Sequence, residues 1–205
     1  LMSVKKQPPS RWPPPIMNDK PTNCSEPTVT AGIDDIRDCR GDRSVLGKLD
    51  IRIDRNGVWY HEGSPIHRKE LVCLFASTLM RDASGAYWLV NPQEMGRIEV
   101  EDVPFVGVEI FVTGAGREQV VSLRTNVDEV VTIDNDHPFE VWTDADTGDP
   151  RPYVLLREGI HARLLRSVYY EVVGLGLEEK IDGEPFYGIW SCGSFFVMGR
   201  LDGEA

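Results

Sequence analysis

Alternating apolar and polar residues predict a half-buried strand at residues 49–54, where the sequence reads LDIRID. A period of two residues places every second side chain on the same face of a strand. Asn56-Gly57 follows, a dipeptide typical of tight hairpin turns, and residues 58–62 supply the returning strand. Further strand-like segments occur at residues 86–91, 96–102, 106–114, 118–125, 129–134, 139–144, 187–193 and 194–200.

Two segments have the 3.6-residue period of an amphipathic helix. The first begins at Ser64-Pro65, where the serine is suited to be the N-cap and the proline to take the first helical position, and it extends to about Arg81. The second covers roughly residues 159–173. We therefore expect two helices, each with one apolar face.

The two halves of the chain repeat an order of residue types. Each contains an Ile-Asp pair, a turn, a Val-Trp pair, a proline and an arginine three residues before Leu or Ile, first from Ile53 to Leu71 and again from Ile133 to Ile160. This order predicts a ββα unit that is used twice. The expected fold is α+β with two lobes, each of which places a helix on a mostly antiparallel sheet.

The composition changes sharply near residue 44. Residues 1–44 are rich in Pro, Ser and Asn and lack apolar periodicity, which predicts an extended or disordered leader. Residues 45–125 are expected to form an N-terminal α+β domain and residues 126–205 a C-terminal one.

Net charge and cysteine spacing narrow the function classes. The chain of 205 residues has 22 Lys and Arg against 33 Asp and Glu, a net charge of −11, so nucleic acid would be repelled except at a local basic patch. No apolar stretch is 18 residues long, so no membrane span is expected. The cysteines at positions 24, 39, 73 and 192 lack zinc-ligand spacing and fit a reducing cytoplasm.

Two adjacent acids interrupt an otherwise apolar strand, IEVEDVPFV, at residues 98–106. Alternation points Asp102 to the apolar side and Glu101 to water, and Pro104 marks the end or the edge of the strand. Arg68 lies near the middle of the apolar face of the first predicted helix, and an inward guanidinium needs a carboxylate. We therefore expect an Arg68–Asp102 pair, which either fixes packing or lines a cleft between the lobes.

A basic spot is expected on the second helix. Arg163, Arg166 and Tyr170 share a face by i, i+3 and i+7 spacing, with Arg151 and Arg157 nearby. Guanidinium groups recognise phosphate or carboxylate with two parallel hydrogen bonds, and tyrosine can stack. The alternative is an ordinary solvated helix face.

Sequence motifs of catalysis and cofactor binding are absent from the chain. It contains no GxSxG, P-loop, GxGxxG or HExxH motif. We predict no catalytic residue, no metal and no cofactor. Trp142 and His161 are expected to be ordinary core residues.

Two long runs carry a family resemblance. Residues 63–106, GSPIHRKELVCLFASTLMRDASGAYWLVNPQEMGRIEVEDVPFV, and residues 152–173, PYVLLREGIHARLLRSVYYEVV, resemble the hallmark segments of bacterial domain-of-unknown-function family 1285. The resemblance implies a two-domain α+β protein with repeated motifs and a C-terminal part superficially like a pleckstrin-homology fold. It further implies an interdomain groove for a protein or nucleic-acid ligand and a link to signal transduction. The hallmark positions of interest are Arg68, Asp102, Pro104, Phe105, Arg157 and Arg163.

Three functions are weighed on these grounds. The first is a cytoplasmic, non-enzymatic module that binds an acidic or phosphate-bearing ligand, such as a protein segment, between the lobes. The second is a nucleic-acid-binding protein that uses the same arginines. The third is an enzyme that uses Asp102 or Glu101 with His67.

Overall fold

The computed structural model describes residues 44–145 and 147–201. The predicted leader therefore lies outside the described residues, except for Ser44. The described chain is mostly β-structure with two short α-helices, in agreement with an α+β fold. None of the helices in this part of the chain has the length and hydropathy that crossing a membrane requires.

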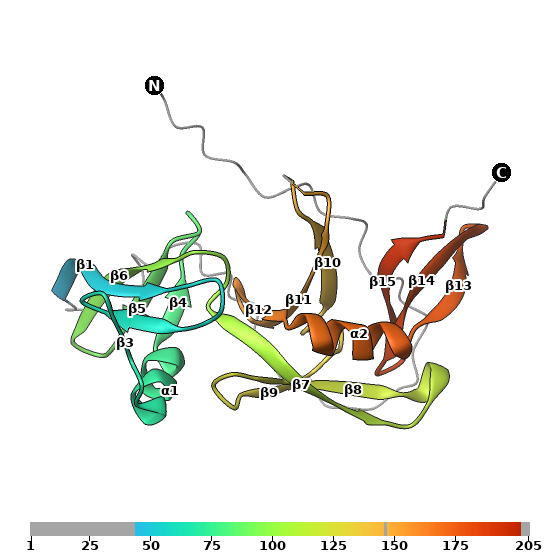
Figure 1. Cartoon of the computed structure of the whole chain (residues 1–205), viewed down its shortest axis with the longest axis horizontal. Helices are drawn as coiled ribbons and strands as arrows, with labels where there is room; N and C mark the ends of the chain where they lie inside the picture. The colour runs from blue at the N-terminus through green and yellow to red at the C-terminus, as the bar shows by residue number, and fades with distance from the viewer. Residues whose placement is uncertain (1–43, 146, 202–205) are drawn as a thin grey trace.

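A six-stranded sheet forms the first lobe (Figure 1). Its spatial order is β3-β2-β1-β6-β5-β4, with β1 and β6 parallel and every other pair antiparallel. Helix α1 (Lys69–Ser77) connects β3 to β4. The strands are β1 (Ser44–Ile53), β2 (Trp59–His61), β3 (Ser64–Pro65), β4 (Leu79–Arg81), β5 (Tyr87–Val90) and β6 (Glu94–Val100).

The second lobe contains another six-stranded sheet, of order β10-β11-β12-β7-β8-β9. Helix α2 (Arg166–Gly174) follows β12, and a three-stranded antiparallel sheet of β13, β14 and β15 completes the lobe. A 3-10 helix, η2 (Gly116–Glu118), lies between β7 and β8. The strands are β7 (Phe105–Thr113), β8 (Val120–Thr125), β9 (Val130–Thr132), β10 (Phe139–Thr143), β11 (Pro150–Arg157), β12 (Ile160–Leu164), β13 (Leu177–Ile181), β14 (Glu184–Ser191) and β15 (Ser194–Arg200).

The two large sheets have the same connectivity. Each consists of two three-stranded meanders, and the first strand of the first meander pairs in parallel with the last strand of the second. This parallel pair is β1 with β6 in the first lobe and β7 with β12 in the second. The strand order is thus repeated, although α1 joins the two meanders of the first lobe and α2 comes after those of the second.

The predicted ββα repeat is not confirmed. Ile53-Asp54 ends β1 and leads directly into its neighbour β2, whereas Ile133-Asp134 connects β9 to β10, which are the opposite edges of their sheet. The expected domain boundary between residues 125 and 126 falls inside the second sheet, between β8 and β9. The two sheets divide instead at residues 101–104.

Both predicted helices were too long. Residues 64–65 and 79–81 pair with β2 and β5 instead of extending α1. The second helix prediction is wrong over residues 160–164, which form β12 between β11 and β7. Ile160, Ala162 and Leu164 are buried in strict alternation with His161 and Arg163, which is the period of a strand.

One apolar core extends through both lobes. Ile53, Phe105 and Leu123 are fully buried in the same cluster, and Trp59 is almost so. Burial of a large apolar side chain stabilises a fold by about 1.5–3 kcal/mol. Because the cluster is continuous, the lobes are held together by packing as well as by the polar contacts described next.

Candidate binding site at the lobe junction

Asp102 faces inward as predicted, but its cation is a different arginine. The Tyr153 hydroxyl donates to Asp102 Oδ1 at 3.0 Å, and Arg163 Nε lies 3.4 Å from Asp102 Oδ2. Both charged side chains are mostly buried, with 17% and 24% exposed. Arg68 is exposed at the N-cap of α1, so the predicted Arg68–Asp102 pair is wrong.

The neighbouring acid behaves as its alternation predicts. Glu101 is exposed and accepts a hydrogen bond from Arg52, and Arg55 Nε lies 3.8 Å away. Pro104 follows the end of β6 at Val100, as expected for a residue that cannot donate to a ladder.

Three rings lie side by side on the strands of the second lobe. The centroids of Trp142 on β10 and Tyr153 on β11 are 4.0 Å apart, and those of Trp142 and His161 on β12 are 5.2 Å apart. The antiparallel register explains this, because Tyr153 pairs with Arg163 and Trp142 pairs with Arg151, so all these side chains emerge on one face. Trp142 and His161 are half-buried there and are not enclosed core residues.

The first lobe supplies Arg81 to the same face. Its Nη1 donates to the Gly159 carbonyl of the second lobe at 3.2 Å, its Nε donates to the Gly85 carbonyl at 3.4 Å, and its guanidinium lies 5.3 Å from the Tyr87 ring centroid. Among the described residues, no carboxylate is within ion-pair distance of Arg81. We call this set the junction platform: Arg81, Tyr87, Asp102, Trp142, Arg151, Tyr153, His161 and Arg163.

The rings of the platform are held in their neutral forms. Burial, with added repulsion from Asp102, raises the pKa of Tyr153 to about 12. Burial lowers the pKa of His161, and the positive charge of Arg81 lowers it further, against an opposing effect of Glu140. Arg151 forms an ion pair with Asp144. Arg81 is therefore the platform cation that has no acidic partner within residues 44–145 and 147–201.

Stability should fall at alkaline pH because of Tyr153. The folded chain keeps this proton up to a pKa of about 12, whereas an unfolded tyrosine loses it near 10.0. The unfolded state thus releases the proton first, and the free energy of unfolding drops as pH rises from 10 toward 12. At pH 11 the loss is about 1.4 kcal/mol. Urea unfolding at about pH 9 and 11 should show this extra loss in wild type but not in Tyr153→Phe; equal losses would contradict the assignment.

Arg157 fastens the lobes to each other. Its Nη1 donates to Glu129 at 2.9–3.0 Å, and its Nη2 donates to the Ala76 carbonyl of the first lobe at 2.7 Å. Ala76 lies in the last turn of α1, where backbone carbonyls lack intrahelical partners. That turn contains no basic residue. Arg157 therefore supplies the cation that this helix end favours.

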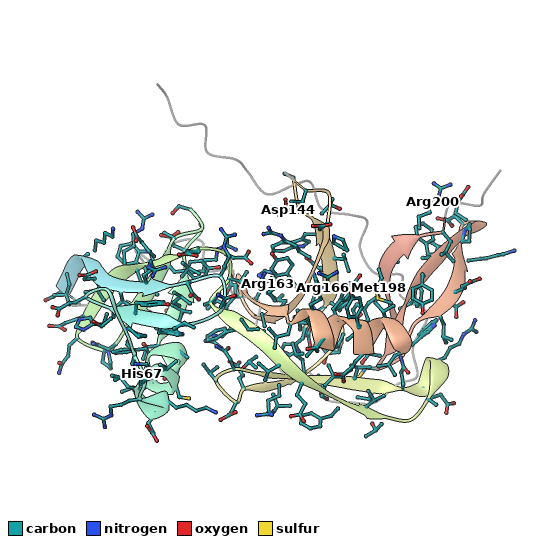
Figure 2. All side chains as sticks on the ribbon, viewed as in Figure 1. His67, Asp144, Arg163, Arg166, Met198 and Arg200 are labelled. Atoms are coloured by element: carbon teal, nitrogen blue, oxygen red, sulfur yellow. The ribbon has the colours of Figure 1, made fainter. Side chains whose placement is uncertain are left out.

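The predicted basic spot is divided between two places (Figure 2). Arg163 lies on β12 at the junction, where its Nη2 also donates to the Arg55 carbonyl of the first lobe. Arg166 and Tyr170 do share an exposed face of α2, with Arg166 Nε donating to the Tyr170 hydroxyl at 2.9 Å. Phe105 is fully buried and packs under the Arg157 guanidinium at 5.5 Å.

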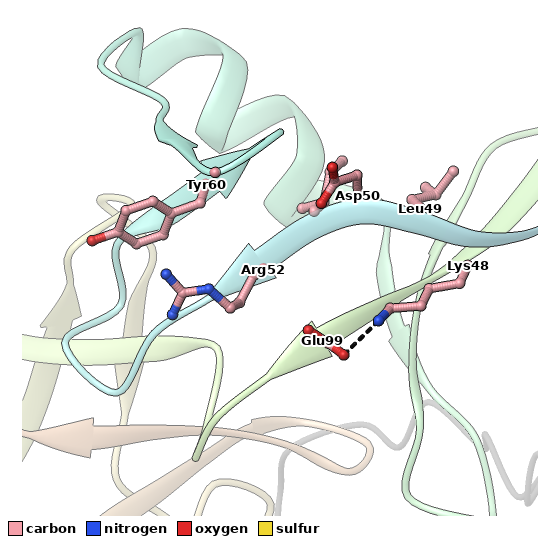
Figure 3. A pocket seen from close by; sticks show the side chains of 8 residues that line it. Lys48, Leu49, Asp50, Arg52, Tyr60 and Glu99 are labelled. Carbon is pink, nitrogen blue, oxygen red and sulfur yellow. Dashed lines mark hydrogen bonds and ion pairs between the residues drawn. The ribbon is translucent and has the colours of Figure 1, made fainter.

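A cavity of about 180 Å³ lies on the first sheet, away from the junction platform (Figure 3). Its cations are already bound: Lys48 Nζ is 2.6 Å from Glu99, and Arg52 contacts Glu101 and the Tyr60 ring. It therefore offers less to a charged ligand than the junction platform does. Across residues 44–145 and 147–201, no three His, Cys, Asp or Glu side chains are grouped as metal ligands.

Sequence reasoning missed Arg81, Trp142, Tyr153 and His161 as site residues. Arg151 and Tyr153 are two residues apart on β11, which was a usable signal that they share one face of the strand, although Tyr153 itself is buried on that face. The proximity of β10, β11 and β12 to Arg81 on β4 depends on the tertiary fold, so local sequence patterns could not predict it.

Comparisons with known proteins agree on one family. A family model described as "Domain of unknown function (DUF1285), N-terminal domain" matches residues 42–103, and "Protein of unknown function (DUF1285), C-terminal domain" matches residues 104–198. The models meet where the first sheet gives way to the second. No curated protein matches the chain.

Two solved structures are similar to this chain. A DUF1285 family protein from Silicibacter pomeroyi DSS-3 is 37% identical, with a TM-score of 0.71, over 78% of this chain and 84% of that one. A DUF1285 family protein from Shewanella baltica OS155 is 23% identical, with a TM-score of 0.48, over 62% and 91%.

Proposed function

This chain belongs to the DUF1285 family, whose two domains are of unknown function, and from that premise we propose that it is a non-enzymatic binding module. Its ligand is an acidic or phosphate-bearing protein segment, and its site is the junction platform. The observation that carries the proposal is Arg81, a half-buried guanidinium beside Tyr87 that lacks a carboxylate partner among the described residues. A charge in such a place favours an anionic ligand.

The surrounding chemistry supports the same ligand class. Guanidinium presents five N–H donors, of which Arg81 uses two, so donors remain for a carboxylate or phosphate. Trp142 and His161 add half-buried ring surface next to it. Rings with a few placed polar groups are typical of ligand sites.

The competing functions gain less support. Asp102 is bound to Tyr153 and Arg163, and exposed His67 lies beside α1 (Figure 2), so the acid–histidine arrangement of the enzyme hypothesis lacks its geometry. The arginines of the nucleic-acid hypothesis are split between two surfaces. We also propose a cytoplasmic location, which the cysteine pattern favours. A role in signal transduction and a pleckstrin-homology-like C-terminal part, which the family resemblance implies, belong to the same proposal.

A direct test uses fluorescence anisotropy with a labelled octaglutamate peptide, its phosphoserine counterpart, octalysine and a short single-stranded DNA. The acidic peptides should bind wild type, and Arg81→Gln should weaken that binding by about tenfold, or about 1.4 kcal/mol. Trp142→Leu should weaken it as well, through the lost ring contact.

Arg97→Gln is the matched control, because it removes one charge from an exposed position on β6. It should bind like wild type. Equal affinity of wild type and Arg81→Gln for the acidic peptides would overturn the proposal, and binding of DNA alone would favour the nucleic-acid hypothesis.

A further inference from the structure

Strand β13 has one edge that no described strand pairs with, at one end of the molecule (Figure 1). It pairs with β14 on one side, and it is the outer strand of its sheet. Ile181 and Glu184 flank the two-residue turn, whose residues both have positive φ. Such flanking residues form a hydrogen-bonded pair, and pairs alternate from there. Glu178 and Lys180 therefore direct their backbone N–H and C=O groups to the open edge.

The edge sequence Leu177-Glu178-Glu179-Lys180-Ile181 complements itself under a two-fold axis. An antiparallel pairing centred on Glu179 places Glu178 opposite Lys180 of a second copy, and Lys180 opposite Glu178. The same pairing places Leu177 opposite Ile181 on the other face. Opposite charges directly across a ladder stabilise it, whereas like charges destabilise it.

Other two-fold registers are disfavoured by charge. A pairing centred on residue 178 places two glutamates opposite each other, and one centred on residue 180 places two lysines opposite each other. Exposed edges usually carry charges that prevent association. Here the signs are arranged so that one register alone among these three is attractive.

The favoured register also sets Glu179 opposite Glu179 of the second copy, but each of these carboxylates is held within its own copy and does not oppose the pairing. The Glu179 carboxylate accepts two hydrogen bonds from Arg117 at 2.8 Å and one from Trp190 Nε1 at 3.0 Å. Arg117 and Trp190 lower the pKa of Glu179, so it stays ionised and compensated. These contacts direct it toward β14 and η2, away from the edge.

We propose that β13 pairs with β13 of a second copy of this chain, which joins two three-stranded sheets into one of six strands. A strand of five residues buries little area, so the dimer is weak, with a dissociation constant on the order of 100 µM. Charge complementarity favours a second copy as the partner, because that copy places Lys180 opposite Glu178 of the first.

Sedimentation velocity of the full chain across about 10 µM to 1 mM, at moderate salt, tests this. Wild type should shift from monomer toward dimer. Glu178→Lys and Lys180→Glu should each weaken association at least about tenfold, and the double exchange Glu178→Lys/Lys180→Glu should restore it. Glu94→Lys, an exposed change of equal charge on β6, should behave as wild type.

Each outcome decides the matter. If the chain stays monomeric at every concentration, the proposal is overturned. Association that survives both single changes overturns this interface, and a double exchange that fails to restore the dimer overturns the register. Normal far-UV circular dichroism of the variants shows that they are folded.

Discussion

Arg163→Met should lower the free energy of unfolding by about 2–4 kcal/mol, which is slightly less than the roughly 3–5 kcal/mol for removing one partner of a fully buried ion pair, because both side chains keep some exposure. Asp102 would keep only the Tyr153 hydroxyl at 3.0 Å, in a place where 17% of its side chain is exposed. The variant would also lose the hydrogen bond that Arg163 donates across the junction to the Arg55 carbonyl. Methionine retains the apolar stem, so the loss reports charge and hydrogen bonding. Urea unfolding measures it.

The adjacent acid provides the control for Arg163→Met. Glu101 is also held by an arginine, Arg52, but that pair is exposed. Arg52→Met should therefore cost at most about 1 kcal/mol, as exposed ion pairs do. Equal losses for the two variants would show that the Asp102 pair is not a buried one.

Arg157→Met should destabilise the chain by about 2 kcal/mol, since hydrogen bonds to charged groups contribute about 1.5–3 kcal/mol. The variant loses the contacts with Glu129 and with the Ala76 carbonyl at the end of α1. About a third of each ion-pair side chain is exposed, which keeps the expected effect below that of Arg163→Met. Thermal unfolding with matched denaturant curves measures it.

Arg68→Met is the informative comparison, because the sequence aligned Arg68 with Arg157. Arg68 is exposed, and its replacement should change the unfolding free energy by no more than about 0.5 kcal/mol. A loss as large as that of Arg157→Met would restore the predicted equivalence of the two arginines and contradict the contacts described above.

Local patterns predicted local structure well. The strand and turn around Ile53 and Asn56-Gly57 were readable because alternation and turn preference act within a few residues. The inward direction of Asp102 and the outward direction of Glu101 followed from the same alternation. These predictions needed no knowledge of the topology.

The partner of Asp102 needed the topology. Residues 160–164 come just before α2, and their apolar positions also fit the 3.6-residue period of that helix. Arg163 was therefore predicted to lie on a helix, whereas it lies on strand β12. The parallel pairing of β12 with β7 sets Arg163 beside Val106, far away in sequence. The predicted repeat was not confirmed for a related reason: similar residue order at Ile53 and Ile133 occurs at different strand connections.

The most direct measurement is a pair of double-mutant cycles on the free energy of unfolding. One combines Asp102→Asn with Arg163→Met, and the other combines Asp102→Asn with Arg68→Met. The coupling energy should be at least about 1 kcal/mol in the first cycle and no more than about 0.5 kcal/mol in the second. Coupling to Arg68 instead of Arg163 would contradict the junction platform on which the proposed function rests.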